Sequence, residues 1–313
     1  MLALQVPCRV TDGEQLRAKL GLLEDYKDTG YQFGIEIVGP WNDFFSLKNV
    51  KVIQKSLRSL PESLYLSLHA PYDARVNWKR NFFSSDKGFT NLLHVFYLAD
   101  FFGVHLVNLH ASLFCTNDEL RKISAAGNLE IRKRELIERV GAVLAEAHSR
   151  YPQQKICLEN MPYCWDHDLA PDPNDMIYET CFVDLKDFLS VVNPGNNIFA
   201  TVDTCHLAAV YDSSQLLGEI KQLGGGLQHV HFTDIKRVWQ PFVSLAEEGV
   251  VPGEGRIGEK IFKELLRYFS EFSLGQDLSI VLEINDKNLI ELTNLKTSLK
   301  KTVGWLDELR QSS

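Results

Sequence analysis

Short apolar runs and longer amphipathic stretches alternate eight times along the 313 residues of the chain. The apolar runs have the length and composition of β-strands and lie near residues 2–9, 33–38, 64–69, 105–110, 155–159, 198–203, 227–232 and 278–284. The stretches with helical spacing lie near residues 13–27, 46–58, 86–102, 118–150, 184–192, 213–223, 256–272 and 287–310. This order predicts an α/β fold, a (β/α)8 TIM barrel formed by residues 1–313 as a single domain.

The composition is typical of a cytoplasmic protein with reduced thiols. Hydrophobic residues make up 45% of the chain, enough for one large core. The six cysteines are scattered without a C-x-x-C pair, so we expect no disulfides. They are Cys8, Cys115, Cys157, Cys164, Cys181 and Cys205.

Neither secretion nor membrane insertion is predicted. The apolar stretch at the N-terminus is broken by Pro7 and Arg9 before it could form a signal-peptide core. Elsewhere no run of about 18 apolar residues occurs without a charge. The formal net charge of −8 also lowers the expectation of general nucleic-acid affinity.

Six polar residues with metal-binding side chains each close one of the apolar runs. The carboxyl ends of the strands of a parallel barrel meet at one rim, so these side chains are expected to converge there. A single such residue would be ordinary, because strand-end carboxylates often cap the next helix and histidines often settle in the core. The six together indicate a metal enzyme. They are His69, His110, Glu159, Asp203, His231 and Glu283.

Four of these residues are the stronger candidates for ligands of one metal ion: Glu159, Asp203, His231 and Glu283. Three carboxylates and one imidazole are a mostly hard ligand set, suited to Mn²⁺, Zn²⁺, Co²⁺ or Mg²⁺. Three negative charges that converge in a water-poor site need either a divalent cation or a proton. We favour the metal.

Three histidines near this group have more than one interpretation. His69 and His110 could complete a second metal site that shares Glu159, or they could bind substrate oxygens. His206 follows Asp203 by three residues, and it is either a further metal ligand, a substrate hydrogen-bond donor or an ordinary residue at a helix start. Strand alternation places His229 inward with His231, as a residue that orients the ligands or as an ordinary buried histidine.

Several features lie in predicted loops at the same rim. Lys236 and Arg237 are either suited to an anionic or polyhydroxylated substrate at the mouth or are solvated loop charges. The glycine-bearing turn PGEGRIG at 252–258 could present backbone N–H groups to an anion. Trp165 belongs to a set of rim aromatics that could stack on a sugar ring or a base. The connections at 160–183 and 233–255 are long, which is typical of functional or mobile loops, and each could instead be a peripheral insertion.

These residues together resemble the xylose isomerase-like TIM-barrel superfamily, which contains sugar isomerases and epimerases and also endonuclease IV-like apurinic-site nucleases. The resemblance spans roughly residues 64–284 and rests on motifs in a fixed order. The motifs are HAPY at 69–72, LVNLHAS at 106–112, LEN at 158–160, VDTCH at 202–206, HFTDIK at 231–236, PGEGRIG at 252–258 and LEI at 282–284.

In the epimerase-like branch, the resemblance implies one Mn²⁺ or similar ion held by the four-residue group. Glu159 and Glu283 would then lie on opposite faces of a ketose and move a proton at the carbon next to the metal-polarised carbonyl. His206 and Arg237 would hold substrate oxygens, and Glu36 would be a further substrate contact or the partner of a neighbouring basic residue.

In the nuclease-like branch, the resemblance implies three zinc ions, the first bound by His69, His110 and Glu159 and the third in part by His206. The segments HAPY and DTCH are closer to this branch. The sequence departs from it at the Asp-x-His pair that precedes the PGEG-like turn, where SLAEEGVVPGEG offers Glu247 and then Gly249. It departs again at HAS in place of HPG and at ENMPYCWD in place of an ENTAG-type continuation.

Three functions follow from these observations. The first is a metal-dependent isomerase or epimerase of a sugar or sugar phosphate. The second is an apurinic-site endonuclease or other phosphodiesterase, the only alternative in which nucleic acid is the partner. The third is a non-catalytic barrel that binds a sugar or a partner protein. None involves a membrane, and no sequence signal specifies an oligomeric state.

Overall fold

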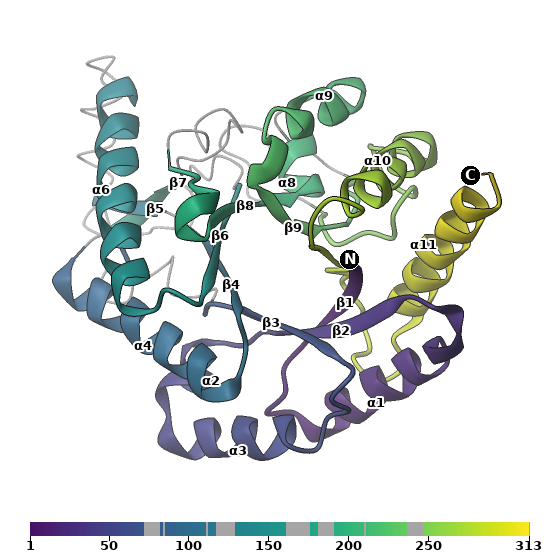
Figure 1. The fold of residues 1–313 in the computed structure, drawn as a ribbon, viewed down its shortest axis with the longest axis horizontal. Helices are drawn as coiled ribbons and strands as arrows, with labels where there is room; N and C mark the ends of the chain where they lie inside the picture. The colour runs from purple at the N-terminus through teal and green to yellow at the C-terminus, as the bar shows by residue number, and fades with distance from the viewer. Residues whose placement is uncertain are drawn as a thin grey trace.

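Eight parallel strands close into a barrel, and the larger helices surround it (Figure 1). The structure is a computed structural model that describes residues 1–71, 82–83, 85–110, 112–116, 129–160, 176–180, 191–209, 211–236 and 247–312. The strands follow one another around the barrel in the order β1-β10-β9-β8-β6-β4-β3-β2. Their bounds are β1 Leu2–Cys8, β2 Gln32–Ile37, β3 Tyr65–His69, β4 Leu106–His110, β6 Lys155–Glu159, β8 Ile198–Asp203, β9 Leu227–His231 and β10 Leu278–Val281. The predicted TIM barrel is confirmed.

The helices between the strands follow the predicted spacing, and the helix expected at 86–102 has those bounds. The α-helices are α1 Gly13–Glu24, α2 Trp41–Phe45, α3 Leu47–Leu57, α4 Asp86–Phe102, α6 Leu129–Arg150, α8 Thr204–Ala208, α9 Leu216–Lys221, α10 Glu259–Phe272 and α11 Thr293–Ser312. Short 3₁₀ turns occupy Lys27–Thr29, Pro194–Asn196, Ser213–Gln215 and Gly224–Gly226. Residues 118–128 and most of the helix expected at 184–192 lie outside the described residues.

Local signals in the sequence explain where several helices begin and end. Asp12 accepts hydrogen bonds from the backbone N–H groups of Glu14 and Gln15 and so caps α1. Ser85 caps α4 in the same way, and Gly103, in the left-handed region with φ 70°, ends it. Within the described part of the chain, no helix is both long and apolar enough to cross a membrane.

A small second sheet was not predicted. Strands β5 (Ser112–Thr116) and β7 (Met176–Thr180) pair antiparallel in a two-stranded sheet of their own. About 60 residues separate the two segments along the chain, so periodicity within either segment could not reveal the pairing. Strand β5 begins two residues after His110, the last residue of β4.

Pairing between neighbouring strands sets the level of each strand-end residue. His110 on β4 lies opposite Glu159 on β6, and Asp203 on β8 lies opposite His231 on β9. Barrel strands that end at matching levels bring these side chains to one rim, as predicted. The thiols of Cys8, Cys157 and Cys205 are buried and unpaired, and the other three cysteine side chains lie outside the described residues.

Candidate metal centre

His231 stands at the centre of the strand-end residues. Its Nδ1 atom lies 2.8 Å from Glu283 Oε2, 3.5 Å from Glu159 Oε2 and 3.7 Å from Asp203 Oδ2. Glu159 ends β6, Asp203 ends β8, and Glu283 follows β10 by two residues. The three carboxylates predicted to share a metal site with His231 therefore converge on its Nδ1 atom.

The environment of this nitrogen fits a divalent cation. His231, Glu159 and Asp203 are buried, whereas the Glu283 side chain is 45% exposed. Although the Glu283 oxygen is only 2.8 Å away, His231 Nδ1 makes no hydrogen bond among the described residues, because the approach lacks hydrogen-bond geometry. A buried nitrogen that faces carboxylate oxygens in this way has the arrangement of ligands around a shared ion.

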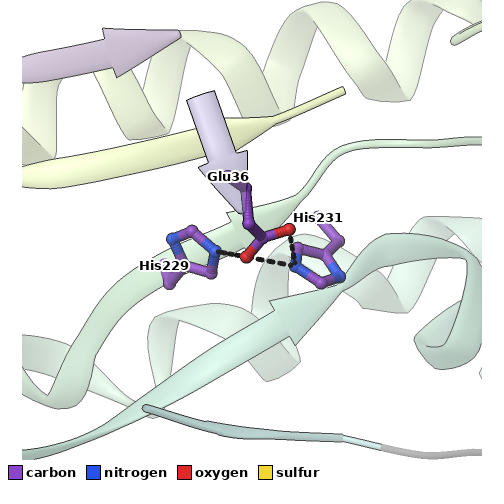
Figure 2. Close-up of side chains that lie close together, drawn as sticks. All are labelled: Glu36, His229 and His231. Carbon is purple, nitrogen blue, oxygen red and sulfur yellow. Dashed lines mark hydrogen bonds and ion pairs between the residues drawn. The ribbon is translucent and has the colours of Figure 1, made fainter. Parts of the chain in front are cut away.

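A buried carboxylate fixes the other edge of the His231 ring. Glu36 on β2 lies between His231 and His229, as Figure 2 shows. His231 Nε2 lies 3.4 and 3.5 Å from the two Glu36 oxygens, and His229 Nε2 lies 3.0 Å from Oε1. When His231 Nε2–H donates to Glu36, Nδ1 keeps its lone pair for a metal.

Of the two interpretations of Glu36, its position matches the partner of neighbouring basic side chains and not the substrate contact. It has no exposed surface and does not line the cavity at the rim, because it lies beneath His231. His229 contacts Glu36 and, through Nδ1, Ser279 Oγ at 2.5 Å. His229 therefore contacts the same carboxylate as His231, and an orienting effect on the candidate ligands would pass through Glu36 (Figure 2).

Burial and charge act in opposite directions on the ionisation of these groups. Burial raises the pKa of Glu36, but His231 and His229 outweigh it and hold the pKa well below its usual range. Burial lowers the pKa of His231, but the charges of Glu159, Glu283 and Glu36 raise it well above its usual value. The carboxylates around His231 therefore stabilise a positive charge there. A divalent ion would supply that charge in place of the proton on Nδ1.

We expect Glu36→Gln to weaken metal binding about 10–100-fold, because the amide no longer fixes the tautomer and charge of His231. Competition with a chromogenic chelator measures the affinity, and Glu247→Gln, an exposed carboxylate paired with Lys236, is the control. Circular dichroism establishes that the variant is folded. A folded variant with wild-type affinity would contradict the role of Glu36.

Glu159 also contacts His69 and His110, the two histidines with more than one interpretation, and so links them to His231. Its Oε2 atom lies 3.2 Å from His110 Nε2 and 3.4 Å from His69 Nε2, and it accepts a hydrogen bond of 2.6 Å from Asn108 Nδ2. His69 Nδ1 lies 2.6 Å from the Ala70 carbonyl oxygen, so the Nε2 lone pair is left to face Glu159. Burial raises the pKa of Glu159, but His231 and His110 lower it far more.

His206 lies at the start of α8 on the far side of Glu159. Its backbone N–H donates to Asp203 Oδ1 at 2.9 Å, so Asp203 is both a candidate ligand and a helix cap. Nδ1 lies 2.9 Å from the Asn160 carbonyl oxygen, and Nε2 lies 3.7 Å from Glu248 Oε2. Glu248 was not predicted as a site residue, and its place beside Glu247 in the acidic pair before PGEG was its only signal in the sequence.

A cavity of about 460 Å³ opens above the metal centre, within the range of small-molecule sites. One wall carries the predicted residues His69, His110, Glu159, Asp203, His206 and Glu283. The lining also includes Arg9, Gln15 and Lys19, from the end of β1 and from α1, and none of these was predicted as a site residue. Lys236 is exposed, pairs with Glu247 at 3.3 Å and does not line the cavity. Arg237 and Trp165 lie outside the described residues.

The PGEGRIG turn binds a carboxylate of the protein itself. Asp234 is buried, and its oxygens accept hydrogen bonds of 2.8–3.4 Å from the backbone N–H groups of Gly253, Gly255, Ile257 and Gly258. A Cβ atom at Gly255 would lie 2.6 Å from Asp234 Oδ1, so only glycine fits there. The turn therefore presents its N–H groups to an anion, as its sequence suggested, and that anion is the Asp234 carboxylate of the protein itself.

Comparisons with known proteins agree with this architecture. A family model described as xylose isomerase-like TIM barrel matches residues 23–309. Among solved structures, a D-tagatose 3-epimerase-like protein has a TM-score of 0.62 at 19% identity, with 99% of this chain and 98% of that chain covered. Endonuclease IV from Thermus thermophilus has a TM-score of 0.59 at 17% identity, with coverages of 98% and 99%.

A third structure, a putative xylose isomerase from Rhodospirillum rubrum, has a TM-score of 0.57 at 14% identity and coverages of 97% and 99%. The sequence search of curated proteins found no match. At these identities the structural likenesses concern the fold.

Proposed function

Because the chain belongs to the xylose isomerase-like TIM-barrel family, we propose that it is a divalent-metal-dependent isomerase or epimerase of a sugar or sugar phosphate. The observation that carries this proposal is the convergence of three carboxylates on His231 Nδ1 at the floor of a cavity of small-molecule size. One of the similar structures is named as a D-tagatose 3-epimerase-like protein, which is consistent with this chemistry.

The residues that would hold the ion are Glu159, Asp203, His231 and Glu283. A Mn²⁺, Co²⁺, Zn²⁺ or Mg²⁺ ion bound there supplies a Lewis acid that polarises a substrate carbonyl. Glu159 and Glu283 both line the cavity and would remove and return the proton on the adjacent carbon. Glu283, with 45% of its side chain exposed, has the freer access to a substrate.

His206 would hold a substrate oxygen. Its Nδ1–H is directed to the Asn160 carbonyl, so Nε2 is the atom available on the cavity side. Burial lowers the pKa of His206, but Asp203 and Glu159 raise it well above the usual value, so the ring can donate from Nε2. His110 and the protonated form of His69 would donate from Nε2 to further substrate oxygens beside Glu159. Burial lowers the pKa of His69, but Glu159 and Glu36 raise it above its usual value, which favours that form.

The test is proton exchange with solvent. Wild-type protein loaded with Mn²⁺, Co²⁺ or Zn²⁺ is incubated in D₂O with a panel of ketoses, aldoses and their phosphates, and deuterium at the carbon next to the carbonyl is measured by NMR. We expect exchange with at least one substrate and a loss of about 10²–10⁴-fold in Glu283→Gln. Glu247→Gln, outside the cavity, is expected to match the wild type. Absence of exchange across the panel would contradict the proposal.

Phosphodiester hydrolysis is the second candidate, favoured by the position of Glu159 Oε2 between His231 and the pair His69 and His110. A carboxylate shared in this way suits two ions, and one similar structure is an endonuclease IV. Gly249 argues against phosphodiester hydrolysis, because it supplies no ligand at the position where the nuclease-like branch has a histidine. A side chain at this position would also clash, since a Cβ atom would lie 2.4 Å from Asn285 Nδ2. Cleavage of duplex DNA at an abasic site would establish this candidate in place of the first.

A further inference from the structure

Lys19, in the lining of the cavity above the metal centre, is a buried cation. It belongs to α1, is 6% exposed and lines the same cavity as Glu159 and Glu283. Its ammonium group donates a hydrogen bond to the Pro7 carbonyl oxygen. Across the described ranges, no carboxylate forms an ion pair with it within 4.0 Å. A buried charge without a countercharge is costly in a folded protein.

The nearest acidic groups are committed elsewhere. Asp12 accepts the backbone N–H groups that begin α1, and Asp286 accepts those of Asn294 and Leu295 at the start of α11. Burial lowers the pKa of Lys19, whereas Cys8, Asp286 and Asp12 act in the opposite direction from a distance. Two of the three ammonium hydrogens remain for a group that enters the cavity.

Gln15 adds a second donor one turn earlier on the same helix. Residues 15 and 19 are four apart, so their side chains share a face of α1. Gln15 Oε1 accepts the Arg9 backbone N–H at 2.7 Å, and this fixes the amide with Nε2 as the remaining donor. Nε2 has no hydrogen-bond partner in the part of the chain that the structure describes, and Gln15 lines the cavity.

Arg9 completes this wall but has its own countercharge. Its Nε and Nη2 atoms lie 2.6 and 3.0 Å from the two oxygens of Asp43, which holds the guanidinium in place. The pair contributes no net charge, so the positive charge of the wall comes from Lys19. The cavity lining thus combines the acidic residues of the candidate metal centre with hydrogen-bond donors of Lys19 and Gln15 that have no partner among the described residues.

We propose that Lys19 and Gln15 form a subsite for an anionic terminal group, a phosphate or a carboxylate, of the molecule that the metal centre transforms. Such a group would supply the countercharge that Lys19 lacks and acceptor oxygens for Gln15 Nε2. Under the proposed function, on which this part rests, the substrate is a sugar phosphate or sugar acid. Its charged end lies against α1 and its carbonyl end lies at Glu159 and Glu283.

Calorimetric titration with inorganic phosphate and, separately, with acetate tests the subsite. Both anions are added to metal-loaded and to EDTA-treated wild-type protein, because an anion could also bind at the metal. We expect binding of at least one anion with and without metal, and a loss of at least about tenfold in affinity in Lys19→Met. The anion that binds more tightly tells a phosphate substrate from a carboxylate substrate.

Two further variants keep the test decisive. Gln15→Glu preserves the acceptor for Arg9 N–H but places a negative charge in the subsite, so it should also lose affinity, and it replaces Lys19→Met if that variant does not fold. Lys236→Met removes an exposed lysine outside the cavity and should retain affinity.

The subsite is overturned if neither anion binds, if binding requires the metal, or if folded Lys19→Met or Gln15→Glu retains wild-type affinity. None of these measurements depends on turnover. A protein that binds phosphate at Lys19 but exchanges no substrate proton would therefore refute the proposed function and leave the subsite intact.

Discussion

Glu159→Gln is expected to lose metal binding and activity together. The Glu159 Oε2 atom lies within 3.5 Å of His231, His110 and His69 and also accepts a hydrogen bond from Asn108. An amide would present either a neutral oxygen or an N–H₂ group to these neighbours, so the site would lose one negative charge and one ligand. We expect a fall of about 10³-fold or more in kcat/KM, since the residue would serve as ligand and as proton carrier.

The control for this variant is Glu247→Gln, which removes an exposed carboxylate that does not line the cavity. Activity is measured at saturating metal concentration, so that weakened metal binding and a lost proton carrier can be told apart. If Glu159→Gln retained wild-type activity under these conditions, Glu159 would have no place in the reaction. Metal content measured on the same preparations reports the ligand role separately.

Asp234→Ala is expected to cause the largest loss of stability. The Asp234 carboxylate is buried and accepts five backbone N–H groups, four from the turn at 253–258 and one from Ile235. Among the described residues no basic side chain lies within 4.0 Å, so its charge is balanced by these N–H dipoles. Removal leaves the N–H groups without an acceptor, and we expect a loss of about 3–5 kcal/mol in the free energy of unfolding.

Urea denaturation of metal-free protein measures this effect without the contribution of a bound ion. The matched control is Glu254→Ala in the same turn, where the side chain is exposed and pairs with Lys301 at 2.8 Å. An exposed pair of this kind contributes at most about 1 kcal/mol. Equal losses in the two variants would show that the hydrogen bonds from the turn to Asp234 do not stabilise it.

The barrel could be predicted because each strand and helix carries its own local signal. The apolar runs coincide with all eight barrel strands, and the N-cap Asp12 marks the first residue of α1. The pairing of β5 with β7 was missed because it joins segments that have no signal relating one to the other. The short helix α2, next to α3, was also missed, since five residues are too few to show a helical period.

The centre of the site was predictable for the same reason as the barrel. A residue that ends a strand has its position fixed by the fold, so Glu159, Asp203 and His231 could be placed at one rim from the sequence alone. Residues whose roles depend on depth or on packing between distant elements could not be placed. Glu36 was recognised as a strand-end carboxylate, but nothing in the sequence indicated that it lies beneath His231.

The part of the cavity that α1 lines could not be predicted for the same reason. Lys19 and Gln15 occupy positions in an amphipathic helix where a polar residue is usually solvated, and only the tertiary structure buries them against the cavity. The PGEGRIG turn had a recognisable anion-binding pattern, yet its anion is Asp234, 19 residues before Gly253 along the chain. A sequence motif of this kind identifies the donors and leaves the acceptor open.

Metal content per chain tests the central claim most directly. Wild-type protein, purified without chelator and dialysed against metal-free buffer, is analysed by inductively coupled plasma mass spectrometry alongside Glu159→Gln. We predict one divalent ion per wild-type chain and a markedly lower content in the variant. Two or three ions per chain would favour phosphodiester hydrolysis. A folded wild-type chain that retains no divalent ion, even after incubation with Mn²⁺, Co²⁺ or Zn²⁺, would contradict a metal centre at His231.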